Sequence, residues 1–305
     1  MIQTALLKLS SGEAMAFPTE TVYGLGADCT NDSAVQKIFT LKGRPAFNPL
    51  IIHVSDIHMA FKYGEFNDTA RTLANKFWPG PLTIVVPLNK NAKISSYVTA
   101  GLDTIAIRCP NHPVALDLLQ QYNVPIAAPS ANISGYVSPT KYEHVHDEFG
   151  DKVFIVPGDQ SCIGLESTIV DCSVTDVAIL RPGFITKENI ETILNMPLTE
   201  KTSSEVIKAP GQFKLHYSPK LPVRLNVTNV HPNEALLNFG QNALTADISL
   251  NLSPQGNLDE AATNLFDYLR KLDKHPNITG IAVSPIPCEK IGVAINERLD
   301  RAASK

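Results

Sequence analysis

The chain has 305 residues, of which 44% are hydrophobic and 18% are charged. At ~150 residues per domain, this length predicts two domains with a sizeable core and excludes a small disulfide-stapled scaffold. No apolar run approaches the ~18 residues that a membrane span requires, and the hydrophobic content excludes a disordered chain. We therefore expect a globular protein without a membrane segment.

Charge is nearly balanced along the sequence. The chain has 26 Lys and Arg against 30 Asp and Glu, which gives a net charge of −4. A cut at Pro219 leaves 17 cationic against 21 anionic residues before it, and 9 against 9 from it onward. Neither part has the basic excess of a nucleic-acid-binding domain. An anionic ligand would need a local cluster of cations, which favours a pocket for a small anion.

The cysteines and the N-terminal segment indicate the cellular compartment. The five cysteines are widely spaced, and no Cys-x-x-Cys pair suggests zinc or redox chemistry. We expect buried free thiols. The N-terminal segment lacks a cationic stretch followed by an apolar one, so it does not resemble a signal peptide, and we expect a cytoplasmic protein.

Short apolar segments alternate with amphipathic ones through residues 1–200, as in a sheet packed against helices. Strands are predicted at residues 14–17, 50–54, 82–87, 104–108, 125–128, 153–156, 168–171 and 177–180, and helices at 2–10, 34–41, 69–77, 113–121, 141–149 and 187–194. Several successive strands lack the dozen or so residues that a parallel crossover needs. The pattern predicts an α/β fold with a mixed sheet.

Domain organisation follows from a break in this pattern. Residues 196–221 contain several Pro, Gly and Ser and have no sustained period, which predicts a linker. The linker would separate a first domain, 1–195, from a smaller α/β domain, 222–305. In the second domain we expect strands at 223–227 and 278–284, helices at 258–274 and 291–303, and an irregular asparagine-rich region at 238–256.

Common nucleotide and metal motifs are missing from the sequence. Gly24-Leu-Gly26 begins a dinucleotide fingerprint, but Cys29 stands at the third glycine position, which disfavours a nicotinamide site. There is no P-loop, His-Glu-x-x-His or Gly-x-Ser-x-Gly sequence. His144 and His146 lie two apart on a predicted helix and do not share a face, so we expect a solvated helix face and no metal pair.

Polar residues cluster where predicted strands end, and in open α/β sheets these loops bind ligands. They include Thr19, Thr21, Lys42, Arg44, Asn48, His53, Thr104, Arg108, Ser130, Asn132, Ser138, Ser167 and Arg181. Arg108 and Arg181 each close an apolar run shortly before a proline, where a fixed guanidinium can bind carboxylate or phosphate. For Lys42 and Arg44 a solvated helix end is the alternative. For Ser130 and Asn132 the alternative is turn formation.

These segments resemble the threonylcarbamoyl-AMP synthase family, whose catalytic module is the YrdC-like domain. The similarity rests on FPTETVYGLGA, KGRPAFNPLIIHV, WPGPLT, TAGLDTIAIRCPNHP, PIAAPSANISGYVSPT, GLESTIVD and ILRPG, which cover residues 1–195 in the family's order. APGQFKLHYSP, residues 209–219, resembles the linker of the longer, two-domain members. The resemblance implies a twisted, open mixed sheet with flanking helices, followed by a smaller Rossmann-like α/β domain.

The resemblance implies a nucleotidyltransferase that joins L-threonine, bicarbonate and ATP into threonylcarbamoyl-AMP and releases pyrophosphate. The product would serve tRNA threonylcarbamoyladenosine modification through downstream transferase proteins, and direct tRNA binding stays open. Mg²⁺ would enter with ATP, and no residue is implied as a metal ligand. The family pattern implies catalytic roles for Lys42, Arg44, Ser130 and Asn132, threonine binding by Thr21, His53, Arg108, Ala128 and Ser167, and ATP binding by Arg44, Asn48, Thr104, Ser130, Ser138, Arg181, His216 and Tyr217.

A mechanism can be outlined on these positions. Attack of a carbamate on the α-phosphate needs positioning and charge neutralisation, and it needs no enzyme nucleophile. Lys42 and Arg44 would carry phosphate charge, and Arg108 would bind the threonine carboxylate. Glu20 and Glu166 are the acidic residues within these motifs that could hold Mg²⁺, but we expect a helix-cap or structural hydrogen-bonding role for both. The linker would close over the pocket as a lid.

Two other functions compete with this one. An RNA-binding module would use a concave cationic surface, which the charge balance disfavours. Carbamoyl-transfer maturation proteins also contain a YrdC-like module, but they would need zinc-finger and acylphosphatase segments, and this sequence has neither.

Overall fold

The computed structural model describes residues 1–198 and 217–304. In these residues a nine-stranded sheet has the order β7-β1-β2-β6-β3-β5-β4-β8-β9. Its strands are β1 Met15–Phe17, β2 Gly24–Asp28, β3 Ile51–His53, β4 Leu82–Pro87, β5 Thr104–Arg108, β6 Ile126–Ala127, β7 Phe154–Ile155, β8 Thr168–Asp171 and β9 Ala178–Arg181. The sheet contains parallel pairs such as β3–β5 and antiparallel pairs such as β4–β5, which confirms the predicted mixed sheet.

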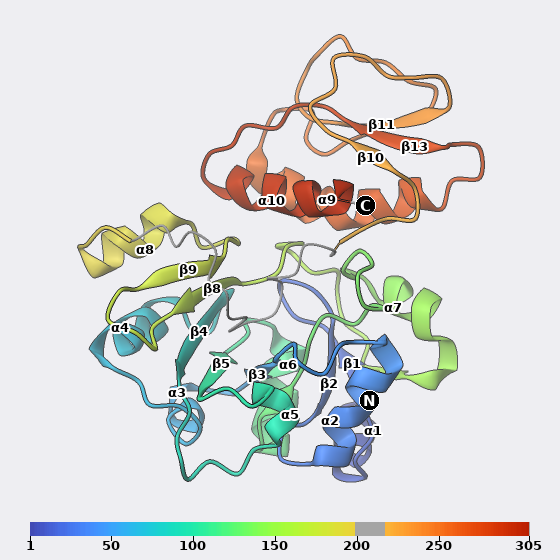
Figure 1. The fold of residues 1–305 in the computed structure, drawn as a ribbon. Helices are drawn as coiled ribbons and strands as arrows, with labels where there is room; N and C mark the ends of the chain where they lie inside the picture. Colours follow the sequence, from blue (N-terminus) through green and yellow to red (C-terminus); the bar gives the residue numbers. More distant parts are fainter. Residues whose placement is uncertain (199–216, 305) are drawn as a thin grey trace.

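Helices flank this sheet on both faces (Figure 1). They are α1 Ile2–Ser10, α2 Asp32–Lys42, α3 Ile57–Ala60, α4 Asp68–Phe77, α5 Ser96–Thr99, α6 Pro113–Tyr122, α7 Tyr142–Phe149 and α8 Lys187–Leu194, with a 3₁₀ turn at Gly150–Lys152. The main core joins α2 and α4 to one face, and α1 and α6 pack on the opposite face beside Met15 and Phe17. Ile51, Val85, Ala106 and Ile169 form a separate apolar cluster where β3, β5, β4 and β8 lie together.

The β2 strand was missed in the sequence because it contains two glycines, which are unfavourable in strands. Packing explains Gly26. A Cβ at this position would lie 2.6 Å from Ile126 and 2.8 Å from Phe17. The Gly-x-Gly sequence therefore allows close approach inside the sheet, and it does not form a phosphate-binding turn.

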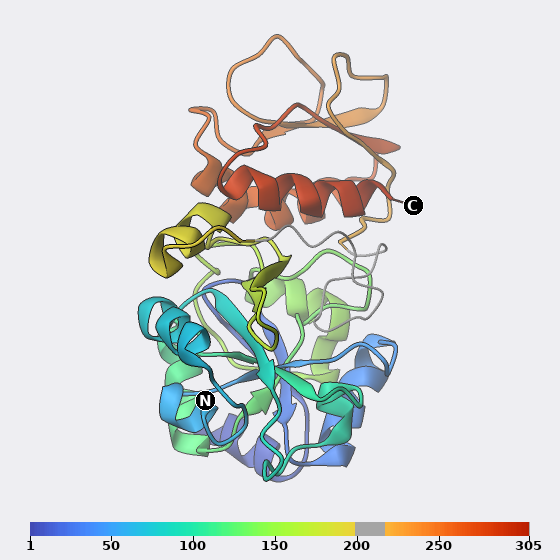
Figure 2. The same cartoon turned by 60° about the vertical axis from the view of Figure 1, so that its left-hand side comes forward.

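The second domain has a four-stranded parallel sheet of order β10-β13-β11-β12. Its elements are β10 Val223–Arg224, β11 Glu234–Asn238, β12 Ser249–Asn251, α9 Leu258–Asp273, β13 Gly280–Val283 and α10 Ile291–Ala303. The predicted helices are confirmed, whereas β11 and β12 were missed because turn-forming asparagines interrupt the apolar pattern. Both helices lie between this sheet and the first domain (Figures 1 and 2).

Buried polar contacts join the two domains. Asp267 of α9 accepts hydrogen bonds from Lys141 at 2.9 Å and from His144 at 3.2 Å. Tyr136 donates its hydroxyl to Asp273 at 2.7 Å. His144 is only 6% exposed, so the predicted solvated helix face is wrong for this residue, although His146 is exposed. The domain contact buries His144, and no pattern within its own helix encodes that contact.

Two further predictions concern thiols and membranes. Cys29, Cys109 and Cys172 are buried free thiols as expected, but Cys162 and Cys288 are exposed. In the described part of the chain, no helix is long and apolar enough to cross a bilayer.

Candidate active site

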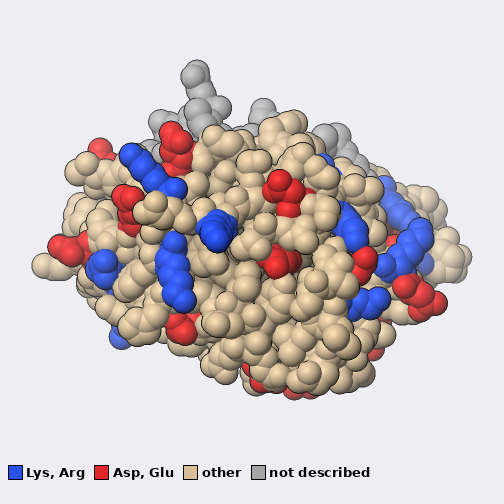
Figure 3. All heavy atoms as spheres, turned by 90° about the horizontal axis from the view of Figure 1, so that it is seen from below, with Lys and Arg blue, Asp and Glu red and all other residues tan. Residues whose placement is uncertain are grey.

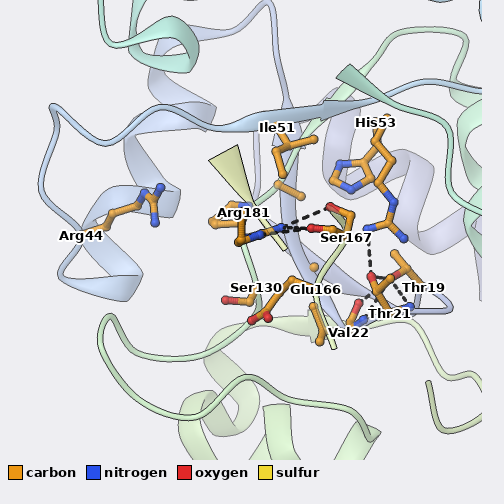
Figure 4. Close-up of a pocket in the computed structure, with 14 residues that line it drawn as sticks. Thr19, Thr21, Val22, Arg44, Ile51, His53, Ser130, Glu166, Ser167 and Arg181 are labelled. Atoms are coloured by element: carbon orange, nitrogen blue, oxygen red, sulfur yellow. Dashed lines mark hydrogen bonds between the residues drawn. The ribbon is translucent and has the colours of Figure 1, made fainter. Parts of the chain in front are cut away.

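A pocket lies beside the small apolar cluster of the nine-stranded sheet, where loops from several segments meet (Figure 4). The segment 19–24 forms part of its wall, the ends of β3, β5 and β9 supply His53, Arg108 and Arg181, and Ser167 directly precedes β8. Figure 4 shows Arg44 at one side of the pocket and His53 at the other, with Arg181 and Ser167 between them. The sheet thus brings residues distant in sequence to one place.

Arg108 ends β5 and is held from three directions. Its Nη1 donates to Thr21 Oγ1 at 2.8 Å, its Nε donates to the Gly80 carbonyl at 3.3 Å, and Nη2 lies 2.7 Å from Glu20 Oε1. Arg108 and Glu20 side chains are each 4% exposed. The buried ion pair and the hydrogen bonds fix the plane of the guanidinium group. A fixed guanidinium can bind a carboxylate or phosphate only in a matching orientation.

Arg181 ends β9 and is fixed against Ser167. Its Nε and Nη2 donate to the Ser167 carbonyl at 3.1 and 2.9 Å, and Nη2 also reaches Ser167 Oγ at 3.2 Å. The Ser167 hydroxyl lies 2.7 Å from Thr83 Oγ1 on β4. Gly183 makes this packing feasible, since a Cβ there would lie 2.4 Å from the Thr168 nitrogen.

Lys42 and Arg44 leave the end of α2 in different directions. Gly43 ends the helix in the left-handed region at φ 60°, which favours glycine and turns the chain. Lys42 is buried, and its Nζ donates to the carbonyls of Ser130, at 2.6 Å, and Asn132. Arg44 lines the pocket and donates to the carbonyls of Asn48 and Pro49. Lys42 thus holds the 130–132 turn, and Arg44 faces the ligand space.

The pocket is electropositive, and its titratable side chains are buried. Burial, and then Arg181, lower the pKa of Arg44; burial also lowers the pKa of Arg181. Burial, and then Arg108, lower the pKa of His53 to about 3, so its ring is neutral near pH 7. Strongly perturbed titratable groups gathered in one cavity are a common mark of a functional site. Repulsion between these cations is relieved when an anion binds.

The two acidic residues near the pocket are both paired. Glu20 pairs with Arg108, and Glu166 pairs with Arg298 of α10 at 3.0 Å. Across the described ranges, no group of three or more His, Cys, Asp or Glu side chains is placed to hold a metal ion. The expected structural roles of Glu20 and Glu166 agree with these pairs.

Comparisons with known proteins cover both domains. A family model described as telomere recombination matches residues 8–183, and a model described as the threonylcarbamoyl-AMP synthase C-terminal domain matches residues 185–304. The threonylcarbamoyl-AMP synthase of Bacillus subtilis is 39% identical, over 99% of this chain and 92% of its own length. The chain belongs to the threonylcarbamoyl-AMP synthase family. Its members are enzymes that use ATP and transfer a nucleotidyl group.

Other members of the threonylcarbamoyl-AMP synthase family agree in sequence and fold. The synthase of Pyrococcus abyssi is 37% identical over 97% of this chain and 92% of its own length. The crystal structure of P. abyssi Sua5 complexed with L-threonine has a TM-score of 0.91 at 35% identity, and the match covers 99% of this chain and 94% of that one. The long two-domain form and its α/β fold are therefore confirmed.

The structure brings together most of the residues predicted from the sequence. Those that line the pocket are Thr21, Arg44, His53, Arg108, Ala128, Ser130, Ser167 and Arg181. Those that lie outside its wall are Lys42, Asn48, Thr104, Asn132, Ser138 and Tyr217, while His216 lies outside the described residues. Tyr217 is buried in the second domain's core and stacks on Phe266 with ring centroids 5.4 Å apart.

Some residues of the pocket were not singled out as ligand-binding positions. Val22, Gly24, Ile51 and Pro129 also line it. Thr19, which the sequence placed among the polar residues at strand ends but without a role of its own, lines the pocket as well. Ile51 and Val22 carry no signal in the sequence, because an apolar residue in a strand or loop is most often part of a core.

Proposed function

We propose that this protein condenses L-threonine, bicarbonate and ATP into threonylcarbamoyl-AMP with release of pyrophosphate. The observation that supports it best is the convergence of three buried guanidinium groups, from Arg44, Arg108 and Arg181, on one pocket that also presents small hydroxyl side chains. The substrates carry a carboxylate and a triphosphate, and fixed guanidinium groups bind both. The product would be used for tRNA threonylcarbamoyladenosine modification.

The two ends of the pocket suit different substrates. Arg108, Thr21 and His53 would bind the threonine carboxylate and hydroxyl, with the Ala128 backbone and Ser167 beside them. Arg44, Ser130 and Arg181 would neutralise and orient the phosphates. Such groups lower the barrier for attack of the carbamate on the α-phosphate by fixing the reactants and by stabilising the charge on phosphorus-bound oxygens.

Four predicted residues outside the pocket wall, two given as catalytic and two as ATP-binding, would act indirectly or at the edge of the nucleotide. Lys42 would act through the turn that it holds, 130–132, and so would position Ser130. Asn48 and Asn132 each have a buried Oδ1 that lacks a hydrogen-bond partner in the described structure. Thr104 shares a sheet face with Ala106 and Arg108 along β5, so a nucleotide lying along this strand would reach it.

Magnesium would accompany ATP. The paired state of Glu20 and Glu166 leaves the described residues of the pocket without a carboxylate cage, which suits a cation carried by phosphate oxygens. Mg²⁺ neutralises phosphate charge when bound. The side chains Arg44 and Arg181 add to that neutralisation.

The setting of the reaction belongs to the same proposal. We expect the protein to act in the cytoplasm and to hand its labile adenylate to downstream tRNA threonylcarbamoyl-transferase proteins. An RNA-binding module is the weaker alternative, because Lys and Arg mix with Asp and Glu on the face shown in Figure 3 and form no continuous basic patch there. Direct tRNA binding would need such a patch.

The test is pyrophosphate release from ATP with purified protein. Release should require both threonine and bicarbonate, and removal of Mg²⁺ with a chelator should abolish it. Arg44→Ala should mainly raise the KM for ATP and Arg108→Ala the KM for threonine, each by about tenfold or more, since each variant loses one charged contact. Threonine-independent release, or no release together with salt-sensitive RNA binding, would contradict the proposal.

A further inference from the structure

The second domain places an arginine directly behind the pocket. Arg298 lies on α10 and is fully buried, with 0% of its side chain exposed. Its Nε donates to Glu166 Oε2 at 3.0 Å. Glu166 lines the pocket and directly precedes Ser167, to which Arg181 is fixed. Arg298 of the second domain therefore directly contacts a residue of the pocket wall.

Glu166 also contacts Ser138, which is one of the predicted ATP-binding residues. Its Oε1 accepts a hydrogen bond from the Ser138 hydroxyl at 2.5 Å. Arg270 of α9 donates to the carbonyls of Val137 and Ser138. Arg270 thus holds the loop at 137–138 directly, whereas Arg298 reaches it through Glu166, the carboxylate that lines the pocket.

The charge of Glu166 makes this contact important for an anionic ligand. Three arginines line the pocket, and an unpaired carboxylate in its wall would repel the ATP phosphates at short range. Arg298 neutralises that carboxylate. Arg298 also contacts Glu297, and Glu297 pairs in turn with Arg301, so two guanidinium groups balance two carboxylates in this cluster.

Arg298 is itself fixed in place. Its guanidinium carbon lies 5.3 Å from the ring centroid of Tyr217, and that ring stacks on Phe266 of α9. These aromatic contacts and the buried position leave the side chain little freedom. The pair with Glu166 therefore depends on where α10 docks.

We propose that Arg298 is a positioning residue of the synthase site, and that its pair with Glu166 makes ATP binding depend on the docked second domain. This proposal rests on the proposed function, because it takes the pocket to be the ATP site. Arg298 does not touch the reacting atoms. It keeps Glu166 neutralised and keeps Ser138 and Ser167 in place.

The experiment compares Arg298→Met, Glu166→Gln and the double variant by steady-state kinetics and by equilibrium ATP binding. Arg298→Met leaves a buried carboxylate beside the phosphate site, so we expect the KM for ATP to rise about tenfold or more, with a smaller change for threonine. In the double variant that charge is gone, and most of the ATP affinity should return. Arg298→Lys keeps a cation and should stay closer to wild type than Arg298→Met.

Lys274→Met is the matched control. Lys274 is a cation of the same domain interface and pairs with Asp147, but it does not contact the pocket wall. This variant should keep the wild-type KM for ATP. If Arg298→Met fails to fold, the double variant and Arg298→Lys still test the proposal. A charge effect predicts near-normal ATP affinity in both of these variants.

Two results would overturn the proposal. One is an unchanged KM for ATP in Arg298→Met. The other is a double variant no better than Arg298→Met, which would mean that Arg298 only stabilises the domain contact. Failure of the proposed function is a separate outcome, because wild-type protein would then show no threonine- and bicarbonate-dependent pyrophosphate release.

Discussion

Individual residues in and directly behind the pocket wall fall into two groups. Arg108, Arg181 and Lys42 are held by hydrogen bonds to neighbouring protein groups, so their geometry is set before a ligand arrives. His53 and Asn132 each have a buried polar atom that has no hydrogen-bond partner in the described structure. Such atoms are costly unless a ligand or water satisfies them. The first group gives preorganised charge, and the second marks where substrate atoms are expected.

The neutral state of His53 leads to a prediction about pH. Its pKa is lowered from 6.5 to about 3 in the folded protein, so the unfolded chain takes up a proton first as the pH falls. The folded protein therefore has its full stability with respect to His53 above pH 6.5, where the ring is neutral in both states. This contribution to the free energy of unfolding is lost as the pH falls from 6.5 toward 3. The free energy of unfolding should drop by up to ~1.4 kcal/mol per pH unit on this account, or about 2 kcal/mol at pH 5.

Urea unfolding of wild type and His53→Gln at pH 7.5 and 5.0 measures this effect. Glutamine does not titrate, so the variant should lose less stability than wild type between the two pH values. His112 and His144, whose pKa values burial also lowers, are present in both proteins and cancel in the comparison. Equal losses in both proteins would show that His53 is not the titrating group.

At the level of elements, the sequence predicted most of the first domain. Long apolar periods located the longer helices and strands, and the predicted ends of these helices lie within two residues of the observed ones, as for 34–41 against Asp32–Lys42. The pattern failed at β2, where Gly24 and Gly26 serve contacts with distant residues. The pocket could be predicted from the strand ends, because loops that follow the strands of an open α/β sheet commonly bind ligands and these loops are rich in polar residues.

Gly183, after β9, provides a prediction at this scale. A methyl group there would lie 2.4 Å from the Thr168 nitrogen and 2.7 Å from the Glu166 carbonyl oxygen. Gly183→Ala must therefore shift the backbone around Ser167, at a cost of about 1–3 kcal/mol in stability. Because Arg181 is bonded to Ser167, kcat/KM for pyrophosphate release should fall as well.

The control for this prediction is Gly280→Ala in β13. A Cβ at Gly280 would meet its nearest atom at 3.4 Å, which is ordinary contact. Thermal unfolding and steady-state kinetics of the two variants should separate them clearly. Wild-type kinetics in Gly183→Ala would mean that the 166–168 backbone is free to move without harm to the site.

At the scale of the whole molecule, the sequence predicted two domains but not how they meet. The interface is built from side chains that look like ordinary surface residues in their own segments, such as Lys141 and Asp267. Their partners lie more than a hundred residues away, so neither helical period nor local charge spacing encodes the pair. For the same reason Glu166 could be named as an acidic residue of the site, while its partner Arg298 could not.

Asp267 allows a test of how far the two domains depend on each other. Burial works to raise its pKa, but hydrogen bonds from His144, Lys271 and Lys141 outweigh burial and hold the pKa well below its usual range. Asp267→Ala leaves the buried His144 and the partly exposed Lys141 without their acceptor across the interface. A buried polar group left without its partner costs about 1–3 kcal/mol, and here that cost falls on domain docking.

Calorimetry should therefore show one unfolding transition for wild type and two for Asp267→Ala, because each domain has its own core but the docking energy that couples them is reduced. Asp300→Ala, which removes an exposed carboxylate of α10, should keep the single transition. A single transition in Asp267→Ala at the wild-type temperature would mean that the apolar part of the interface, with Val22, Val137 and Leu165, is sufficient to couple the domains. The coupling matters for function, because the second domain can support the ATP pocket through Arg298 only while it stays docked.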